Sequence, residues 1–139
     1  IVHWPDGIKD RGALRMTPGH VVDLAPTILD LVGPISNEEP SVVESPLHAG
    51  ISLTPSFSED VELDREYLYF RHAGNRALRT GNWKIVSRVG NEGRWELYDL
   101  SIDRCEQNDL CDEHPERLST MVARWEELDS LFQRQAGDP

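Results

Sequence analysis

Apolar residues at helical spacing mark the end of the chain. Between residues 115 and 136 they recur every three or four positions, which predicts one long helix with a single apolar face. Pro115 suits the first turn of this helix, where its missing N–H costs nothing, and Gly137 and Pro139 end it. The expected apolar face consists of Leu118, Met121, Val122, Trp125, Leu128 and Phe132.

Four short segments between residues 66 and 100 predict strands. They are EYLYF (66–70), NRALRT (75–80), WKIVSRV (83–89) and RWELYDL (94–100). A Gly-Asn pair at 81–82 indicates a hairpin turn between the second and third segments, and GNEG at 90–93 indicates the next turn. The pattern therefore predicts an α+β fold, in which the long C-terminal helix packs on a four-stranded antiparallel sheet.

The first 33 residues predict a strand followed by a helix. IVHWP at 1–5 is typical of a short strand closed by proline, and 20–22 are expected to be extended. A helix is expected over 24–32, with Asp23 as its N-cap and Gly33-Pro34 as its stop. Leu24, Ile28, Leu31 and Val32 would form its apolar face. Residues 34–64 hold several prolines and no periodicity, which predicts a long connection that crosses a surface or joins two domains.

Composition excludes some functions and leaves others open. The 139 residues suit one domain or two small pieces, and a net charge of −11 argues against a nucleic-acid partner. No apolar run approaches the roughly 18 residues of a membrane span. The chain opens without Met on IVHWP, so a fragment of a longer protein is expected. Cys105 and Cys111 are compatible with a local disulfide and equally with two reduced thiols.

One stretch departs from the acidic composition. Residues 71–88 hold five cations, His72 and no acid. Converging cations on a hairpin would bind an anion such as sulfate, phosphate or carboxylate, with a proton or hydrogen bond from His72 and a hydroxyl contact from Asn75. The alternative is an ordinary solvated strand face whose charges keep the strand from aggregating. Trp83 and Trp95 are expected in the core, with sugar stacking as the alternative.

Five stretches in this order resemble the C-terminal part of type I sulfatases, the arylsulfatase-like enzymes of the alkaline phosphatase superfamily. They are IVHWPDGI, HVVDLAPTILDLVG with its D-x-x-PT pattern, GISL, YLYFRHAGNRALRTGNWKIV and WELYDLSIDRCEQNDLCDEHPERL. The fourth is similar to the family's H-x-G-N-R-A-x-R-x-G-x-W-K segment. The resemblance implies that residues 1–61 are the end of a large α/β domain with its connecting loop. Residues 62–139 would be the small C-terminal subdomain.

The resemblance also implies a hydrolase of sulfate esters whose chemistry lies elsewhere in the parent enzyme. The family uses a formylglycine made from Cys or Ser in a C/S-x-P-x-R motif and a divalent cation, usually calcium. Cys105 is followed by Glu106 and Gln107, so no catalytic or metal-binding residue is expected in this chain, which alone should be inactive. The implied partners are the N-terminal catalytic domain of the same polypeptide and a sulfated small molecule or glycan. The parent is expected to be periplasmic or secreted.

The resemblance implies substrate contacts for His72, with Asn75 and Arg76 beside it, whereas Arg79 and Lys84 would be structural. Many relatives have an acid where Arg71 stands. Two alternatives remain: part of a phosphonate or phosphodiester hydrolase of the same superfamily, and a non-catalytic module that binds an anionic glycan. A piece at 1–33 without its sheet partners is further expected to expose apolar surface or to pair with another copy.

Overall fold

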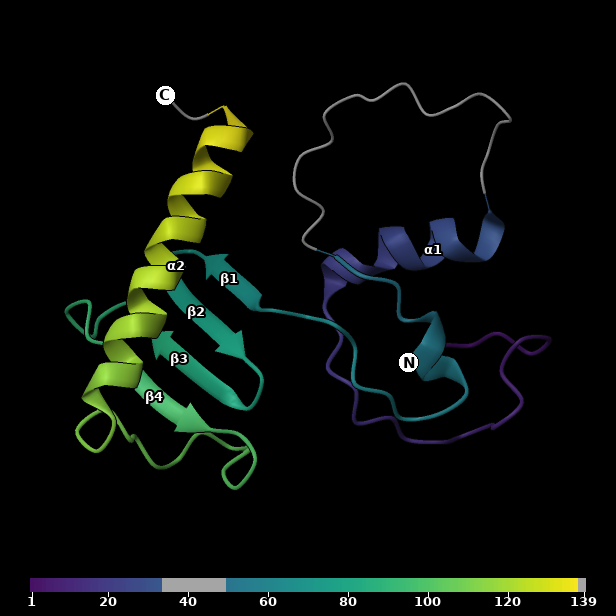
Figure 1. Ribbon diagram of the computed structural model, residues 1–139, viewed down its shortest axis with the longest axis horizontal. Helices are drawn as coiled ribbons and strands as arrows, with labels where there is room; N and C mark the ends of the chain where they lie inside the picture. Colours follow the sequence, from purple (N-terminus) through teal and green to yellow (C-terminus); the bar gives the residue numbers. More distant parts are fainter. Residues whose placement is uncertain (34–49, 138–139) are drawn as a thin grey trace. The chain divides into compact units, whose positions relative to one another are not determined.

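The computed structural model describes residues 1–33 and 50–137 of the chain. The chain divides into two compact units, Ile1–Asp64 and Arg65–Pro139, each of which is described by itself (Figure 1). None of the helices within the described residues is both long and apolar enough to cross a membrane.

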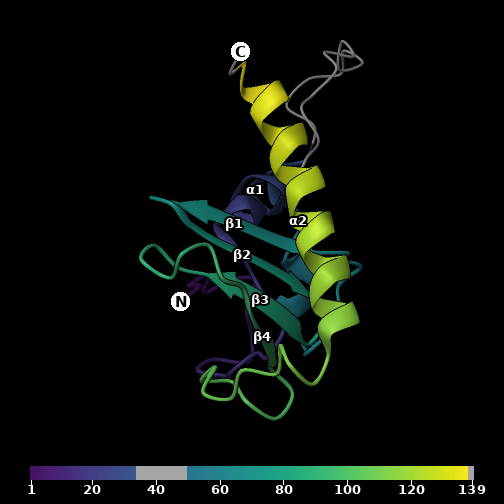
Figure 2. The same cartoon turned by 90° about the vertical axis from the view of Figure 1, so that its left-hand side faces the viewer.

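The second unit is a meander of four antiparallel strands with one long helix. The strands are β1 (Leu68–His72), β2 (Asn75–Thr80), β3 (Trp83–Ser87) and β4 (Glu96–Asp99), and they lie in the sheet in chain order. The helix α2 (Pro115–Ala136) lies along one face of this sheet, as Figures 1 and 2 show. The α+β architecture predicted for this part of the chain is therefore confirmed.

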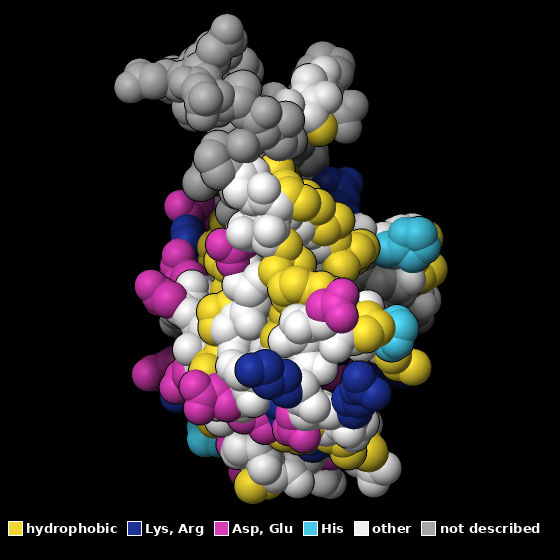
Figure 3. Space-filling view, turned by 90° about the vertical axis from the view of Figure 1, so that its right-hand side faces the viewer, with side chains coloured by type: hydrophobic (Ala, Val, Ile, Leu, Met, Phe, Trp, Pro, Cys, Tyr) yellow, Lys and Arg dark blue, Asp and Glu magenta, His cyan; other side chains and the backbone are white. Residues whose placement is uncertain are grey.

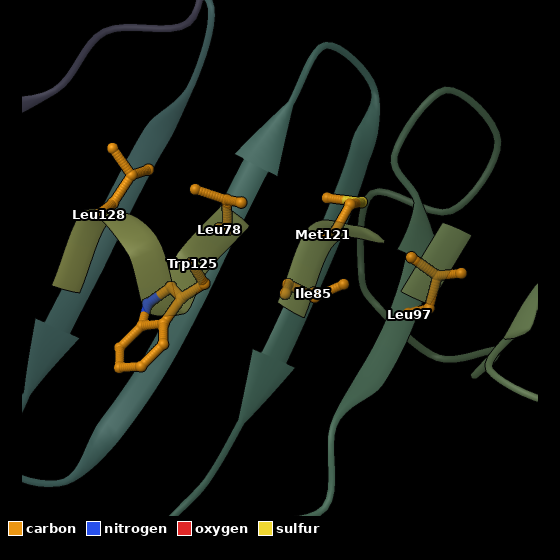
Figure 4. Close-up of a cluster of buried hydrophobic side chains, with 6 residues drawn as sticks. All are labelled: Leu78, Ile85, Leu97, Met121, Trp125 and Leu128. Atoms are coloured by element: carbon orange, nitrogen blue, oxygen red, sulfur yellow. The ribbon is translucent and has the colours of Figure 1, made fainter. Parts of the chain in front are cut away.

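The core of this unit lies between α2 and the sheet. Leu78, Ile85 and Leu97 come from three neighbouring strands and are fully buried. Figure 4 shows them facing three buried side chains of α2, which are Met121, Trp125 and Leu128. The remaining apolar residues predicted for this helix face, together with Trp83 and Trp95, pack around that cluster. The predicted helix face and the predicted place of both tryptophans are confirmed.

The outer edge of β4, which has no neighbouring strand among the described residues, is covered by the segment that leads to α2. The amide of Leu97 donates to the Asp109 carboxylate at 3.0 Å, and the carbonyl of Leu97 accepts from the Leu110 amide at 2.8 Å. Because these groups are paired, the edge offers less backbone for pairing with another chain.

The first unit holds a short 3-10 turn (Val21–Asp23), the helix α1 (Leu24–Val32) and a second 3-10 turn (Thr54–Phe57). The helix expected over 24–32 is confirmed, but two other predictions are wrong. Residues 1–5 form no strand, because the first unit offers no other strand to pair with among its described residues. Only His20 of 20–22 is extended, because Val21 begins the 3-10 turn.

Asp23 is the N-cap residue of α1 as predicted, but its side chain makes no capping hydrogen bond to this helix. Its buried carboxylate accepts instead from the His20 amide at 2.7 Å and from the Ile51 amide at 3.1 Å. Thr27 makes a similar link, because its hydroxyl accepts from the Leu53 amide at 2.9 Å. A side chain at Gly50 would collide with the backbone of Val22, which explains why a glycine begins the GISL segment. Asp and Thr of the D-x-x-PT pattern thus bind GISL.

About half of the connection predicted at 34–64, residues 34–49, lies outside the described residues. The described part, residues 50–64, runs back past the first 3-10 turn and α1. It also forms hydrogen bonds with the irregular segment that precedes this first turn. Arg15 donates to the carbonyls of Ser56 and Ser58, at 3.0 and 2.9 Å, and Thr17 donates to the Val61 carbonyl at 2.8 Å.

The apolar side of α1 is exposed. Its side chains keep between 42% and 63% of their accessible surface, and Figure 3 shows a wide yellow area on this face of the molecule. The residues are Leu24, Ile28, Leu29, Leu31 and Val32. The expected exposure of apolar surface in 1–33 is confirmed.

Candidate functional site

The β1–β2 hairpin carries the residues that the sequence singles out. His72 and Asn75 are paired at the end of the two strands, and Ala73 and Gly74 form the turn between them. Both turn residues have positive φ, 47° and 81°, as a two-residue hairpin turn of type I′ requires. A side chain at Gly74 would lie 2.7 Å from a methyl group of Val89. The H-A-G-N sequence therefore suits a tight turn packed against residue 89.

His72 and Asn75 are brought together at this tip. The amide group of Asn75 donates to the His72 carbonyl at 3.3 Å, and its oxygen accepts from the Val89 amide at 3.1 Å. Both side chains are exposed. The imidazole of His72 has no hydrogen-bond partner among the residues that the structure describes. A neutral or protonated imidazole in this position can donate to, or exchange a proton with, a ligand above the tip.

Arg76 lies on the opposite face of the sheet from His72. It follows Asn75 directly, so strand alternation turns its side chain toward α2. The guanidinium donates to the Ser87 hydroxyl at 2.9 Å and to the Gly93 carbonyl at 3.5 Å. It also lies over two tryptophan rings, 4.8 Å from the centre of Trp95 and 5.4 Å from that of Trp125. The structure therefore does not group Arg76 with the other two predicted site residues.

The other cations of residues 71–88 each have a partner within the second unit. Arg71 pairs with Asp129 at 2.9 Å, and Lys84 forms an ion pair with Glu106. Arg79 donates to the Gly81 carbonyl at 2.8 Å. The fifth cation, Arg88, makes two hydrogen bonds to the Glu96 carboxylate, at 2.8 and 3.0 Å. Because acids or carbonyls elsewhere in the fold engage them, these cations do not form a common anion site.

Two tyrosines next to these ion pairs hold their protons more tightly than usual. Burial and a hydrogen bond to Glu96 raise the pKa of Tyr98 to about 12. Burial and a hydrogen bond to Asp129 also raise the pKa of Tyr69. Each phenol donates to its carboxylate, so neither tyrosine is poised to act as a base near neutral pH.

The described residues do not fit a calcium site. No three His, Cys, Asp or Glu side chains within 1–33 and 50–137 lie close enough together to hold a metal ion. Both cysteines are free thiols in the structure, and Cys105 is exposed. Cys111 lies 3.5 Å from the Arg94 guanidinium and 3.4 Å from the Asp109 carboxylate.

Comparisons with known proteins point in one direction. No family model matches the chain. An uncharacterized sulfatase of Schizosaccharomyces pombe is 32% identical over 110 residues, which cover 76% of this chain and 20% of that protein. The N-acetylglucosamine-6-O-sulfatase of Bacteroides thetaiotaomicron is 28% identical over 125 residues, which cover 79% of this chain and 20% of that protein.

A solved structure shares the fold of this chain. The crystal structure of Ps i-CgsB matches 81% of this chain and 24% of its own chain, with a TM-score of 0.59 and 26% identity. The chain spans about a fifth of the length of the curated relatives that it matches.

Proposed function

We propose that this chain, a homologue of sulfatases as its motifs predicted, forms the C-terminal region of a longer enzyme that hydrolyses sulfate esters. In this proposal the chain lines the substrate pocket and does not supply the nucleophile. The main support is that sulfatases match the chain over about a fifth of their own length, and that the chain carries the H-x-G-N-R segment on an exposed hairpin.

The proposal assigns catalysis to the rest of the longer protein. A formylglycine and a calcium ion would there supply the nucleophile and the charge that stabilises the sulfate group. Neither cysteine here lies in a C-x-P-x-R motif, and the described residues do not fit the metal. The isolated chain is accordingly expected to be inactive.

Within the chain, His72 is the residue proposed to contact substrate. Its imidazole is exposed at the hairpin tip, where it can donate a hydrogen bond to a sulfate oxygen or to a hydroxyl of the substrate. Asn75 stabilises the tip through its hydrogen bonds to the His72 carbonyl and the Val89 amide, and its side-chain amide lies beside His72. A relative is an N-acetylglucosamine-6-O-sulfatase, which supports a sulfated sugar as the substrate class.

The exposed side of α1 supports a partner for the first unit. Leu24, Ile28 and Val32 keep more than half of their surface, which is unusual for large apolar side chains on one helix face. We assign this face to contact with the N-terminal catalytic domain of the same polypeptide. In the isolated chain it is free to pair with a second copy.

The test compares the longer protein with the 139-residue chain on N-acetylglucosamine-6-sulfate and on an aryl sulfate. We expect the longer protein, carrying calcium and formylglycine, to release sulfate, and the isolated chain to release none. Activity of the isolated chain would overturn its assignment as a non-catalytic region. A fully loaded longer protein that cleaves a phosphodiester and no sulfate ester would move the proposal to the related phosphoester hydrolases.

A further inference from the structure

We propose that Arg76 is a positioning residue, which holds His72 in place by fixing the loop at residues 88–93 from the far side of the sheet. The catalytic relevance of this inference rests on the proposed function, but the coupling itself does not. The inference replaces the expectation that Arg76 contacts substrate beside His72.

The surroundings of Arg76 favour a structural partner over a ligand. Its guanidinium lies over Trp95 and Trp125, and a planar cation on aromatic faces gains both stacking and cation–π attraction. Its donors reach the buried Ser87 and the Gly93 carbonyl. The side chain is therefore committed to the α2 side of the sheet, away from the exposed imidazole.

The loop that Arg76 contacts needs external bonds to keep one conformation. Gly90, Glu92 and Gly93 all have positive φ, at 88°, 48° and 78°. Such a backbone is costly for glutamate and is flexible at glycine, so it persists only where neighbouring groups hold it. Within the loop, two turn hydrogen bonds join Asn91 to Arg88 and Arg94, at 3.2 and 2.8 Å.

Two consecutive residues of β2 hold the two ends of this loop. Arg76 binds the carbonyl of Gly93 at one end, and Asn75 binds the amide of Val89 at the other. Asn75 also donates to the carbonyl of His72. The path from Arg76 thus runs through the loop, then Val89 and Asn75, to the backbone of His72, and it uses both faces of the sheet.

The first experiment measures amide hydrogen exchange by NMR in the 139-residue chain. We expect Arg76→Lys and Arg76→Met to speed exchange at Val89 by about tenfold or more, the size of a lost hydrogen bond to a charged group. The core amides of Leu78 and Ile85 should change much less. The matched control is Arg79→Lys on the other face of the same strand, which should leave Val89 unchanged. Unchanged exchange at Val89 in Arg76→Met, or an equal increase at all sheet amides, would overturn the inference.

The second experiment is a double-mutant cycle in the longer enzyme on a sulfated N-acetylglucosamine. If Arg76 acts through His72, Arg76→Lys lowers kcat/KM in the wild-type background and has little further effect after His72→Ala. Fully additive losses would contradict the coupling. An inactive wild-type enzyme would count against the proposed function alone, because the exchange experiment decides the role of Arg76 without any activity.

Discussion

Thr27 illustrates how one buried hydroxyl joins segments that are distant in the sequence. It donates to the Asp23 carbonyl at 2.6 Å and accepts from the Leu53 amide at 2.9 Å, so it links α1 to the GISL segment. Removing the hydroxyl leaves the partly buried Leu53 amide without this partner, and an unpaired amide costs up to about 1–3 kcal/mol when it is fully buried.

We expect Thr27→Val to keep the shape of the side chain and to destabilise the first unit by about 1–2 kcal/mol. Hydrogen exchange at the Leu53 amide should then be about 5- to 30-fold faster. Thr120→Val is the matched control, because Thr120 is exposed and its hydroxyl donates to the Glu116 carbonyl of its own helix. Equal and small effects of both substitutions would show that the link between α1 and residues 51–53 adds no stability.

Asp23 and Arg76 show which contacts of a single residue can be predicted from the sequence. The alternation in NRALRT places Arg76 on the same side as Leu78, so its direction toward the core was available from the sequence. The partner of Asp23 was not, because the Ile51 amide lies 28 residues further along the chain. Local patterns indicate which way a strand residue points, whereas such a distant backbone contact depends on how the segments pack.

Among the elements, β4 carries both Glu96, which forms an ion pair, and Tyr98, which is buried. Tyr98 is 6% exposed and donates to Glu96, which also receives two hydrogen bonds from Arg88. The pKa of Tyr98 rises to about 12 through burial and this hydrogen bond, compared with about 10 for an unfolded tyrosine.

The pH dependence of stability follows from this raised pKa. The folded state keeps the phenol proton more tightly, so the contribution of Tyr98 is fully present below about pH 10. It is lost as the pH rises from about 10 to about 12. Urea unfolding across this range should show a fall in unfolding free energy that is smaller in Tyr98→Phe. Parallel pH profiles for the two proteins would contradict the assignment.

The elements of the second unit were predictable because their signals are local. Strand alternation, a Gly-Asn turn and a helical apolar stripe all lie within short windows, and the observed strands and helix follow them. The strand expected at 1–5 was predicted from its apolar composition alone. A strand needs hydrogen-bond partners, which the described residues of the first unit do not offer, so composition alone misled the prediction.

The molecule as a whole joins an ordered sheet–helix unit to a unit with an exposed apolar helix face. We expect the isolated chain to self-associate through α1. Ile28→Gln should shift sedimentation-velocity profiles toward the monomer. Ile102→Gln is the matched control, because Ile102 is 84% exposed in the second unit. A wild-type chain that stays monomeric at all concentrations would refute the pairing.

The partners of the cations in residues 71–88 were not evident from the sequence alone. The cations of residues 71–88 predict either an anion site or solvated strand faces, and the fold engages them with its own acids, carbonyls and aromatic rings. The imidazole of His72 is exposed and unpaired among the described residues, which supports the proposal that it meets the substrate.

The most direct test of the account is the effect of His72→Ala on sulfate release by the longer enzyme. With N-acetylglucosamine-6-sulfate as substrate, we predict that kcat/KM falls by about tenfold to a hundredfold, the worth of one hydrogen bond to a charged group, while calcium binding and the unfolding midpoint stay unchanged. A His72→Ala enzyme with the wild-type kcat/KM would contradict the account.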